Sequence, residues 1–310
     1  FVVKPLLWCM DPYLRGSFDA CGGIRGRFEV GQAIASRGVG EVVASKSLQF
    51  PRGSHVLAML PWASCSVHGP GPPDACSKMA NLKSFARVPG LDLPKHMSAL
   101  GSSSLSAHLA LKHVMHPTAG QTAYVSGAAG SVGQVACQLL KHVYGARVLG
   151  SAGSQEKVDF ILSQLGVDGA FNYNAEAPRD ALRRLGGKDG VDFYFDNVGG
   201  ETLDQVLEVI NKHGRILCCG GISQYDKSTE GGYGIRNWMQ MIEKSLRMQG
   251  FMLTDFADKM QEGTDELLEM FKQGKLQTRE TVFKGMEALP KAFIGLFSGA
   301  NIGKMLVMAD

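Results

Sequence analysis

Residues 124–138 read YVSGAAGSVGQVACQ, and this stretch decides the fold. Before it, residues 122–126 form a short apolar and β-branched run that is typical of a buried strand; after it, apolar residues recur at helical spacing. Between the two lie Gly127, Gly130 and Gly133, and the pattern that starts at Ala128 is A-x-G-x-x-G. Such a turn lets the backbone approach a pyrophosphate, whose charge is met by the N-terminus of the helix. A plain strand-to-helix turn has the same glycines, but the flanking strand and helix favour a dinucleotide site.

The next strand indicates which dinucleotide binds. An NAD site usually places an Asp or Glu near the adenosine ribose, about 20 residues past the glycines. Here residues 150–157 read GSAGSQEK, and no acid ends the strand predicted over 147–151. A carboxylate would repel a ribose 2′-phosphate, whereas Lys157 and the nearby serines offer it a cation and hydroxyl groups. The sequence therefore predicts NADPH/NADP⁺ rather than NAD(H); the alternative for Lys157 is a solvated lysine at a helix start.

Composition and charge exclude several classes of function. The chain has 310 residues, of which 45% are apolar and 20% charged, so two domains with substantial cores are expected. Its 32 Lys and Arg against 29 Asp and Glu give a net charge of +3. This excess of positive charge is too small to predict binding to nucleic acid. No apolar stretch is long enough to cross a bilayer, so we expect a cytoplasmic protein with no membrane partner. Because the chain opens on FVV without a methionine, we expect the natural N-terminus to lie outside this sequence.

Cysteine and histidine spacing gives no support for a metal site. The seven cysteines contain no C-x-x-C pair, and their odd number fits no closed disulfide framework, so reduced thiols are expected. His113 and His116 lie three residues apart, but no H-E-x-x-H motif or Cys-rich lobe supplies further ligands. We therefore predict no metal.

The rest of the chain divides into two parts with different hydrophobic patterns. Up to about residue 100 the hydrophobic period changes often and Gly and Pro are frequent, as in a twisted β-barrel with long loops. A helix over 105–114 then leads into alternating strands and helix-length segments, which predict a parallel sheet with crossover helices. The expected strands are 122–126, 147–151, 170–173, 191–197, 215–220 and 248–253, followed by a helix over 267–272 and a last strand over 305–308.

Ligands of open α/β sheets bind at the carboxyl ends of the strands. Residues 220–225, GGISQY, follow one such end, and the phenol of Tyr225 can hydrogen-bond an enolate or supply a proton to it. The alternative for Tyr225 is a ring that packs under the cofactor. Residues 226–237, DKSTEGGYGIRN, have the composition of a mobile lid, and equally of an ordinary exposed loop.

Several long motifs, in order, carry a resemblance to a known family. MDPYLRG near the start, VSGAAGSVGQ, GSAGSQEKVD, YFDNVGG, HGRILCCGGISQYD, MQGFML and GANIGK are similar to zinc-independent medium-chain dehydrogenase/reductases. The chain most resembles the NADPH-dependent alkenal double-bond reductases and prostaglandin (leukotriene B4 dehydrogenase-type) reductases, and the plant type among them. The resemblance implies a doubly wound Rossmann sheet plus a GroES-like β-barrel, and commonly a homodimer. The implied domains are a GroES-like substrate domain over 1–104, a Rossmann NADP-binding domain over 105–255, and a return to the first domain over 256–310.

The resemblance also implies roles for single residues. Tyr225 matches the family tyrosine assigned to the enolate oxygen, and Tyr13 matches one that borders the substrate. A G-M-x-G-x-T-A-Y stretch usually lies beside the nicotinamide, and residues 101–108, GSSSLSAH, depart from it and end in His. The implied cofactor contacts are Gly130, Ser131, Val132, Gly133, Lys157, Tyr173, Asn197, Cys219, Gly220, Gly221, Ile222, Ser223, Tyr225, Phe251, Met252, Leu253 and Asn301.

These inferences together predict an enzyme that reduces the C=C bond of a small α,β-unsaturated aldehyde or ketone. Hydride would move from NADPH to the β-carbon, Tyr225 would stabilise the enolate, and the α-carbon would then be protonated. Two alternatives stay open: an NADPH quinone oxidoreductase on the same fold, and a nucleotide-binding structural protein without turnover.

Overall fold

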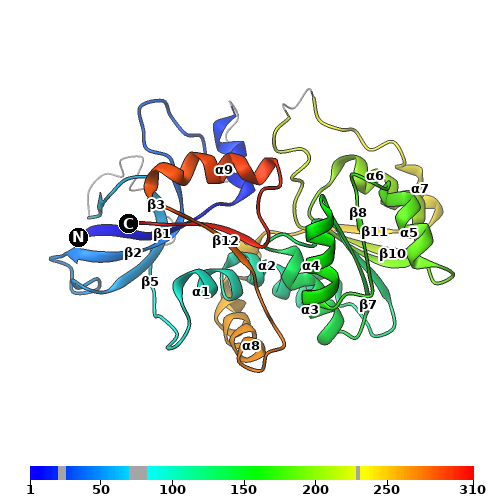
Figure 1. Cartoon of the computed structure of the whole chain (residues 1–310), viewed down its shortest axis with the longest axis horizontal. Helices are drawn as coiled ribbons and strands as arrows, with labels where there is room; N and C mark the ends of the chain where they lie inside the picture. The colour runs from blue at the N-terminus through cyan, green and yellow to red at the C-terminus, as the bar shows by residue number, and fades with distance from the viewer. Residues whose placement is uncertain (20–25, 70–81, 228–230) are drawn as a thin grey trace. The chain divides into compact units, whose positions relative to one another are not determined.

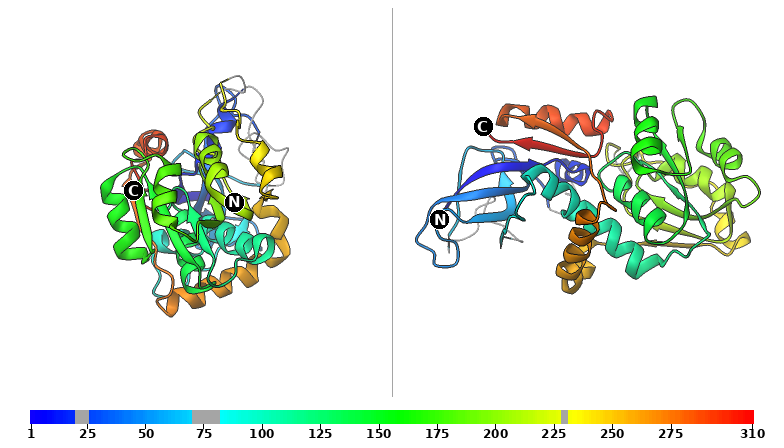
Figure 2. Two further views of the ribbon diagram at one scale, coloured as in Figure 1. Left: turned by 90° about the vertical axis from the view of Figure 1, so that its right-hand side faces the viewer. Right: turned by 60° about the horizontal axis from the view of Figure 1, so that its bottom comes forward.

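The computed structural model describes residues 1–19, 26–69, 82–227 and 231–310. The chain forms two compact units, one of residues 1–97 with 280–310 and one of residues 98–279. Figures 1 and 2 show that the second unit is an open sheet with helices on both faces, and that the first is built mainly of strands. The predicted α/β class, with a Rossmann sheet and a separate β domain, is confirmed.

The sheet of the second unit is parallel throughout, in the order β11-β10-β9-β6-β7-β8. Counted from β6 and read from β8, this is the order 3-2-1-4-5-6 of a doubly wound dinucleotide-binding fold. Its central strands are apolar because helices cover them on both faces. The strands are β6 Thr122–Val125, β7 Arg147–Ala152, β8 Gly169–Asn172, β9 Val191–Asp196, β10 Ile210–Cys218 and β11 Arg247–Gly250.

Helices lie on both faces of this sheet, with α3 and α4 on one side and α5 and α6 on the other (Figure 1). Local chemistry sets their ends. Ser154 caps the start of α4 and Gly166 ends it with a left-handed φ of 64°. Pro178 opens α5, where its missing N–H has no helical acceptor to lose. The helices are α3 Gly133–His142, α4 Gln155–Leu165, α5 Pro178–Gly186, α6 Gly200–Val209 and α7 Met239–Glu243.

Two further helices pack on α3's side of the unit and differ from their predicted extents. The helix expected over 105–114 is α2 Ser102–Ala110, which continues as one π-helical turn, η2 Leu111–Met115. The helix expected over 267–272 begins earlier, as α8 Met260–Lys272, preceded by η3 Leu253–Lys259. The first half of this helix is polar, so it has no apolar pattern from which to predict it. A Cβ on Gly263 in this half would lie 3.0 Å from a terminal carbon of Leu109 on α2, so the two helices are closely packed here.

The sheet of the first unit has the strand order β12-β13-β1-β2-β3-β5, with β4 also paired to β1. Strand β12 runs parallel to β13, and the other pairs are antiparallel. Close backbone approach between β1 and β2 requires glycine: a Cβ on Gly38 would lie 2.4 Å from the carbonyl oxygen of Leu7. The strands are β1 Val2–Cys9, β2 Ala35–Ala44, β3 His55–Pro61, β4 Ser66–Val67, β5 Lys83–Ser84, β12 Glu280–Lys284 and β13 Lys304–Met308.

The C-terminal segment belongs to the first unit. Strand β13 lies between β12 and β1, and helix α9 Leu289–Phe297 packs its apolar face into the same core. The other short elements of this unit are η1 Pro12–Phe18, α1 Leu93–Ala99 and η4 Met286–Ala288. The chain passes between units at 97/98 and 279/280, whereas the sequence predicts 104/105 and 255/256. The first boundary differs because the whole of α2 belongs to the second unit, and the second differs because α8 packs against α2 and keeps residues 256–279 with that unit.

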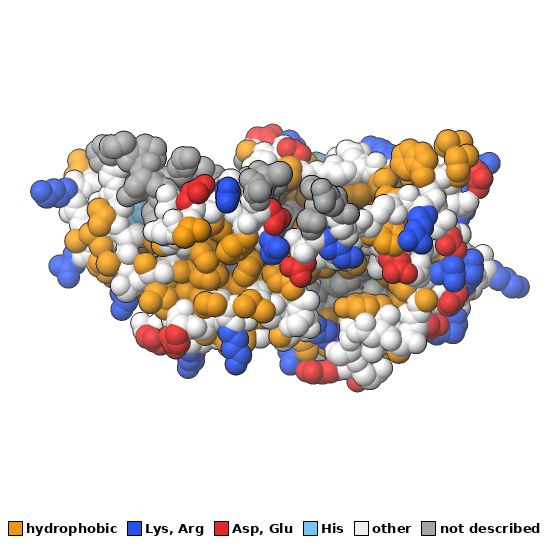
Figure 3. All heavy atoms as spheres, turned by 90° about the horizontal axis from the view of Figure 1, so that it is seen from above, with side chains coloured by type: hydrophobic (Ala, Val, Ile, Leu, Met, Phe, Trp, Pro, Cys, Tyr) orange, Lys and Arg blue, Asp and Glu red, His pale blue; other side chains and the backbone are white. Residues whose placement is uncertain are grey.

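Surface charge is mixed in sign. On the face drawn in Figure 3, basic and acidic side chains are interspersed. Within the described ranges, no helix is long and apolar enough to span a membrane.

Candidate active site

The turn between β6 and α3 is built for close approach of the backbone. Gly127 has a φ of 58°, and a Cβ on Gly133 would lie 2.3 Å from the carbonyl oxygen of Gly127. The hydroxyl of Ser131 is buried and has no hydrogen-bond partner among the described residues. The first N–H groups of a helix also have no acceptor within the helix. An unpaired hydroxyl beside such N–H groups fits an anionic ligand such as a pyrophosphate.

Lys157 and Tyr173 flank the loop that follows β7. The backbone N–H of Lys157 donates to the Ser154 hydroxyl at 3.4 Å, in the first turn of α4. Burial lowers the pKa of the Lys157 ammonium below its ordinary value. The phenol of Tyr173 lies so close to the loop that a Cβ on Gly153 would be 2.5 Å from its oxygen. The structure thus brings both predicted residues to the edge where an adenosine ribose would lie.

At the centre of the sheet, Asn197 joins the ends of β6 and β9. Its backbone N–H donates to the Ser126 hydroxyl at 3.0 Å, and its side-chain amide donates to the Ser126 carbonyl oxygen at 2.8 Å. The neighbouring carboxylate of Asp196 is buried and accepts from the Tyr194 hydroxyl at 2.6 Å and from the N–H of Gly199 at 2.8 Å. Burial raises the pKa of Asp196 in spite of these bonds.

Asp196 is a residue that the sequence reasoning did not assign. Its carbonyl oxygen accepts from the N–H groups of Cys219 and Gly220, at 2.9 and 3.1 Å, so it also orients the loop after β10. The sequence does show an acid at the end of an apolar strand, with Gly199 and Gly200 shortly after it. This pattern alone does not distinguish a buried carboxylate from an exposed turn residue.

Tyr225 ends the loop that leaves β10. Its hydroxyl oxygen accepts a hydrogen bond from the N–H of Gly221 at 3.1 Å, and a Cβ on Gly220 would lie 3.3 Å from it. No described residue accepts the hydroxyl's own proton in a hydrogen bond. Burial raises the pKa of the phenol, which therefore stays protonated at neutral pH. The side chain presents a hydrogen-bond donor, as a group that stabilises an oxyanion must.

The remaining cofactor candidates of this unit follow β11. Because β10 and β11 are parallel neighbours, Phe251, Met252 and Leu253 lie at the same edge of the sheet as the Tyr225 loop. The Phe251 ring lies 6.1 Å from that of Phe256, and Met252 is 44% exposed. The carboxyl edge therefore gathers all the predicted cofactor residues of the second unit: Gly130, Ser131, Val132, Gly133, Lys157, Tyr173, Asn197, Cys219, Gly220, Gly221, Ile222, Ser223, Tyr225, Phe251, Met252 and Leu253.

Two predicted residues belong to the first unit. Tyr13 lies in η1 and is half-buried against the core of that unit. The side-chain amide of Asn301 donates to the carbonyl oxygen of Gly303 at 2.7 Å, in the turn that leads into β13. A buried ion pair between Asp11 and Lys304 joins the two segments. Burial opposes the charge of Lys304, but the attraction of Asp11 outweighs it and raises the lysine pKa.

Residues 101–108, which depart from the family motif, form the N-cap and most of helix α2. His108 is 3% exposed, and its Nε2 lies 2.5 Å from a carboxylate oxygen of Glu266 on α8. Lys112 contacts the other oxygen of the same carboxylate at 2.6 Å. His108 therefore belongs to the contact between α2 and α8. Across the described parts of the chain, no group of three or more His, Cys, Asp or Glu side chains is placed to hold a metal ion.

Comparison with known proteins places the chain in a family. A profile described as zinc-binding dehydrogenase matches residues 131–272, and one described as the N-terminal domain of oxidoreductase matches residues 1–73. A 2-alkenal reductase (NADP(+)-dependent) of Nicotiana tabacum is 37% identical over 313 residues, which cover 100% of this chain and 87% of the relative. The chain belongs to the medium-chain dehydrogenase/reductase family.

Other members of the medium-chain family agree with this assignment. A (+)-pulegone reductase of Mentha piperita is 34% identical, over 99% of this chain and 86% of the relative. Among solved structures, CurA of Vibrio vulnificus in complex with NADPH has a TM-score of 0.86 at 29% identity, over 100% of this medium-chain reductase and 89% of CurA. The resemblance predicted from the motifs is thereby confirmed.

Proposed function

We propose that this protein reduces the C=C bond of α,β-unsaturated aldehydes and ketones with NADPH. The observation that carries the proposal is the likeness, over the whole of this chain and 87% of the relative, to a reductase whose name specifies both NADP and 2-alkenal substrates. The relative named for pulegone supports the same reaction. The CurA complex supports NADPH as the cofactor.

The residues at the carboxyl edge fit this cofactor and have distinct tasks. When bound, NADPH supplies a hydride to the β-carbon of the enal or enone. Residues 130–133 hold the pyrophosphate with backbone N–H groups and the unpaired hydroxyl of Ser131. Lys157 binds the 2′-phosphate, and Tyr173 borders the adenosine ribose. The rest of the cofactor would be contacted by Asn197, residues 219–223, residues 251–253 and Asn301.

Tyr225 is the catalytic residue in this proposal. Negative charge develops on the carbonyl oxygen of the substrate when hydride reaches the β-carbon, and a protonated phenol can donate a hydrogen bond to that oxygen. The Gly221 N–H holds the phenol oxygen in place, so the O–H is directed by a fixed backbone group. The enolate then takes a proton at its α-carbon, which completes the saturated carbonyl product. Tyr13 borders the substrate in the first unit.

We also propose, from the family resemblance, that the enzyme is zinc-independent, cytoplasmic and a homodimer, with neither nucleic acid nor membrane as a partner. Metal analysis of the purified protein, light scattering and cell fractionation test these points separately. The quinone oxidoreductase of Pseudomonas syringae, at 22% identity and a TM-score of 0.73, shares the fold, and quinones therefore belong in the substrate test.

The deciding experiment is an NADPH-oxidation screen over cinnamyl-type aldehydes, alkenals, cyclic enones and quinones, with each product identified. We expect saturated aldehydes or ketones from the unsaturated carbonyls. Rapid quinone reduction without saturation of any enone would instead identify a quinone oxidoreductase. NADPH binding without turnover of any compound would leave a nucleotide-binding protein.

A further inference from the structure

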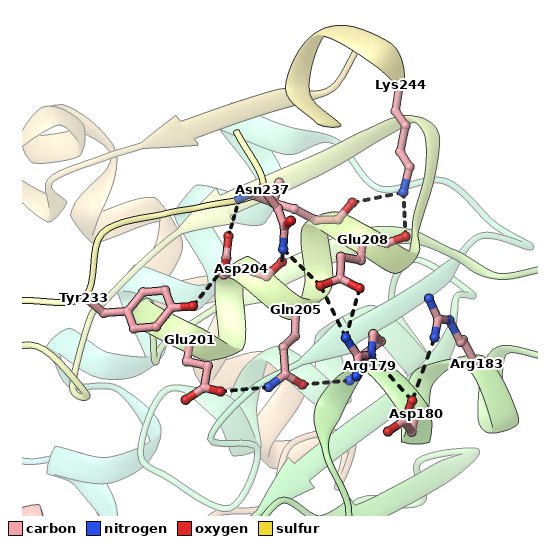
Figure 4. A network of polar contacts seen from close by, with 11 residues as sticks. Arg179, Asp180, Arg183, Glu201, Asp204, Gln205, Glu208, Tyr233, Asn237 and Lys244 are labelled. Carbon is pink, nitrogen blue, oxygen red and sulfur yellow. Dashed lines mark hydrogen bonds and ion pairs between the residues drawn. The ribbon is translucent and has the colours of Figure 1, made fainter. Parts of the chain in front are cut away.

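The segment that follows the loop of residues 219–225 is attached to helix α6 at the buried side chain of Asp204 and, through Asn237, at Glu208 (Figure 4). The Asp204 carboxylate is 4% exposed and accepts three hydrogen bonds. One oxygen accepts from the N–H groups of Arg236 and Asn237, at 3.0 and 2.8 Å, and the other accepts from the Tyr233 hydroxyl at 2.9 Å. The sequence allowed a lid or an ordinary exposed loop here, and its described part, residues 231–237, is held at this carboxylate.

Tyr233 extends this attachment back to the Tyr225 loop. Its backbone N–H donates to the side-chain oxygen of Gln224 at 2.7 Å, while its hydroxyl is on Asp204. Gln224 is the residue next to Tyr225 in the chain. A single residue, Tyr233, thus connects the buried carboxylate on α6 to the loop that carries the phenol.

The side chain of Gln224 is fixed on its other side as well. Its amide donates to the Ser223 hydroxyl at 2.7 Å, and that hydroxyl donates to the Val198 carbonyl oxygen at 2.7 Å. The amide also packs on the first residue of α6, since a Cβ on Gly200 would lie 2.2 Å from its nitrogen. Gln224 therefore has little freedom once Tyr233 is in place, and the backbone that leads to Tyr225 is held with it.

We propose that Asp204 and Tyr233 are positioning residues for Tyr225 and act through Gln224. We call Asp204, Tyr233 and Gln224 the Asp204 clamp. The proposal rests on the function proposed above. The clamp contacts no reacting atom in this role. It sets the direction of the phenol relative to the substrate oxygen, because hydrogen bonds to a buried carboxylate are stronger than neutral ones and hold the segment in one place. A small displacement of a catalytic group can cost up to about 100-fold in rate.

The first test removes single bonds of the clamp. We expect Tyr233→Phe, which deletes only the hydroxyl bond, to slow hydride transfer to an enone about 10-fold, and Asp204→Asn to slow it by a similar factor. Rates are followed in single turnovers, so that product release does not hide the step. The Kd of NADPH, measured by fluorescence titration, should stay within about twofold, because both substitutions leave the bond from Gln224 to Ser223, a proposed cofactor contact, in place.

Matched controls separate this effect from general disturbance. Tyr144→Phe makes the same chemical change in the second unit, two residues after the end of α3. Asp180→Asn makes the acid-to-amide change at the exposed end of the network in Figure 4, where Asp180 contacts Arg179 at 3.5 Å. Both controls should leave the rate of hydride transfer unchanged.

The second test asks whether the clamp acts through Tyr225. In a Tyr225→Phe background, Tyr233→Phe should have no further effect on the rate, because the hydroxyl that it positions is already absent. Losses that multiply in the double variant, or a rate that Tyr233→Phe and Asp204→Asn both leave unchanged, would overturn the clamp while leaving the reductase function intact. A wild-type protein that saturates no enone would overturn both proposals.

Discussion

At the scale of single residues, Tyr225 carries the proposed chemistry. Its phenol is fixed by the Gly221 N–H and has its own proton available. We expect Tyr225→Phe to lower the rate of hydride transfer by roughly 10- to 1,000-fold, since the ring remains and only the donor is lost. Single-turnover oxidation of NADPH with an enone measures it. An unchanged rate would assign the ring to packing under the cofactor.

The pH dependence gives an independent check on the same residue. Burial raises the Tyr225 pKa, so the phenol keeps its proton to a higher pH than an exposed tyrosine, which ionises near about 10. The donor form is therefore present below that range and is lost only as the pH rises through the raised pKa. We expect no loss of rate assignable to Tyr225 between about pH 6 and 9, and an alkaline decline that Tyr225→Phe lacks.

We expect Lys157 to distinguish NADPH from NADH. Burial lowers the pKa of its ammonium, and a bound 2′-phosphate would stabilise the charged form. We expect Lys157→Ala to weaken NADPH binding by about 10-fold or more and to leave NADH binding almost unchanged, because only the phosphate makes this contact. Fluorescence titration with both cofactors tests it. Equal losses for the two would remove Lys157 from the phosphate site.

At the scale of elements, the β6–α3 turn depends on the absence of one side chain. A methyl group on Gly133 would meet the carbonyl oxygen of Gly127 at 2.3 Å and the Cα of Ala128 at 2.7 Å, and both are backbone atoms that cannot rotate away. We expect Gly133→Ala to cost about 1–3 kcal/mol in the free energy of unfolding and to weaken NADPH binding, because the turn must open.

Gly186, the last residue of α5, provides a control for this substitution. The nearest atom to a Cβ there is a methyl group of Val191 at 3.9 Å, which is ordinary contact. Gly186→Ala should therefore leave stability unchanged or raise it slightly. Denaturant unfolding of the two variants compares them. Equal stabilities for both would show that the turn tolerates a side chain.

At the scale of the whole molecule, the two ends of the chain meet in the core of the first unit. Asp11, after β1, pairs with Lys304 at the start of β13, and the two residues are 7% and 1% exposed. We expect Lys304→Met to cost about 3–5 kcal/mol in the free energy of unfolding, because it leaves the Asp11 carboxylate buried without its partner.

The double variant Asp11→Leu/Lys304→Met tests the reason for this loss. Replacement of both charges by apolar groups should recover most of the stability, since no unpaired charge remains. Lys259→Met, which breaks an exposed pair with Asp258, is the control and should change stability little. If the single variant Lys304→Met unfolds at the wild-type denaturant concentration, the pair contributes nothing.

Much of this molecule follows from local sequence. Three features depend only on residues close together in the chain: the A-x-G-x-x-G turn, the apolar pattern of each strand and helix, and the absence of an acid after β7. Each of them specifies a local conformation or a local charge. The six parallel strands were predicted from such patterns, although β10 begins at Ile210, five residues before the expected 215. The candidate cofactor residues of the second unit were expected at one edge because parallel strands share their carboxyl ends.

Only the tertiary structure decided which distant residues are partners. In the sequence, Asp204 is one more polar residue of an amphipathic helix. Its role becomes visible only in the structure, where Tyr233 and Asn237 donate hydrogen bonds to its carboxylate. Asp11 and Lys304 lie at opposite ends of the chain, and the packing of α8 on α2 moved the boundary between units to 279/280. The sequence by itself determined the elements, the turn and the preference for a phosphate-bearing cofactor, because these depend on neighbours in the chain. It did not determine the buried polar pairs, because their energies arise only when packing removes both partners from water.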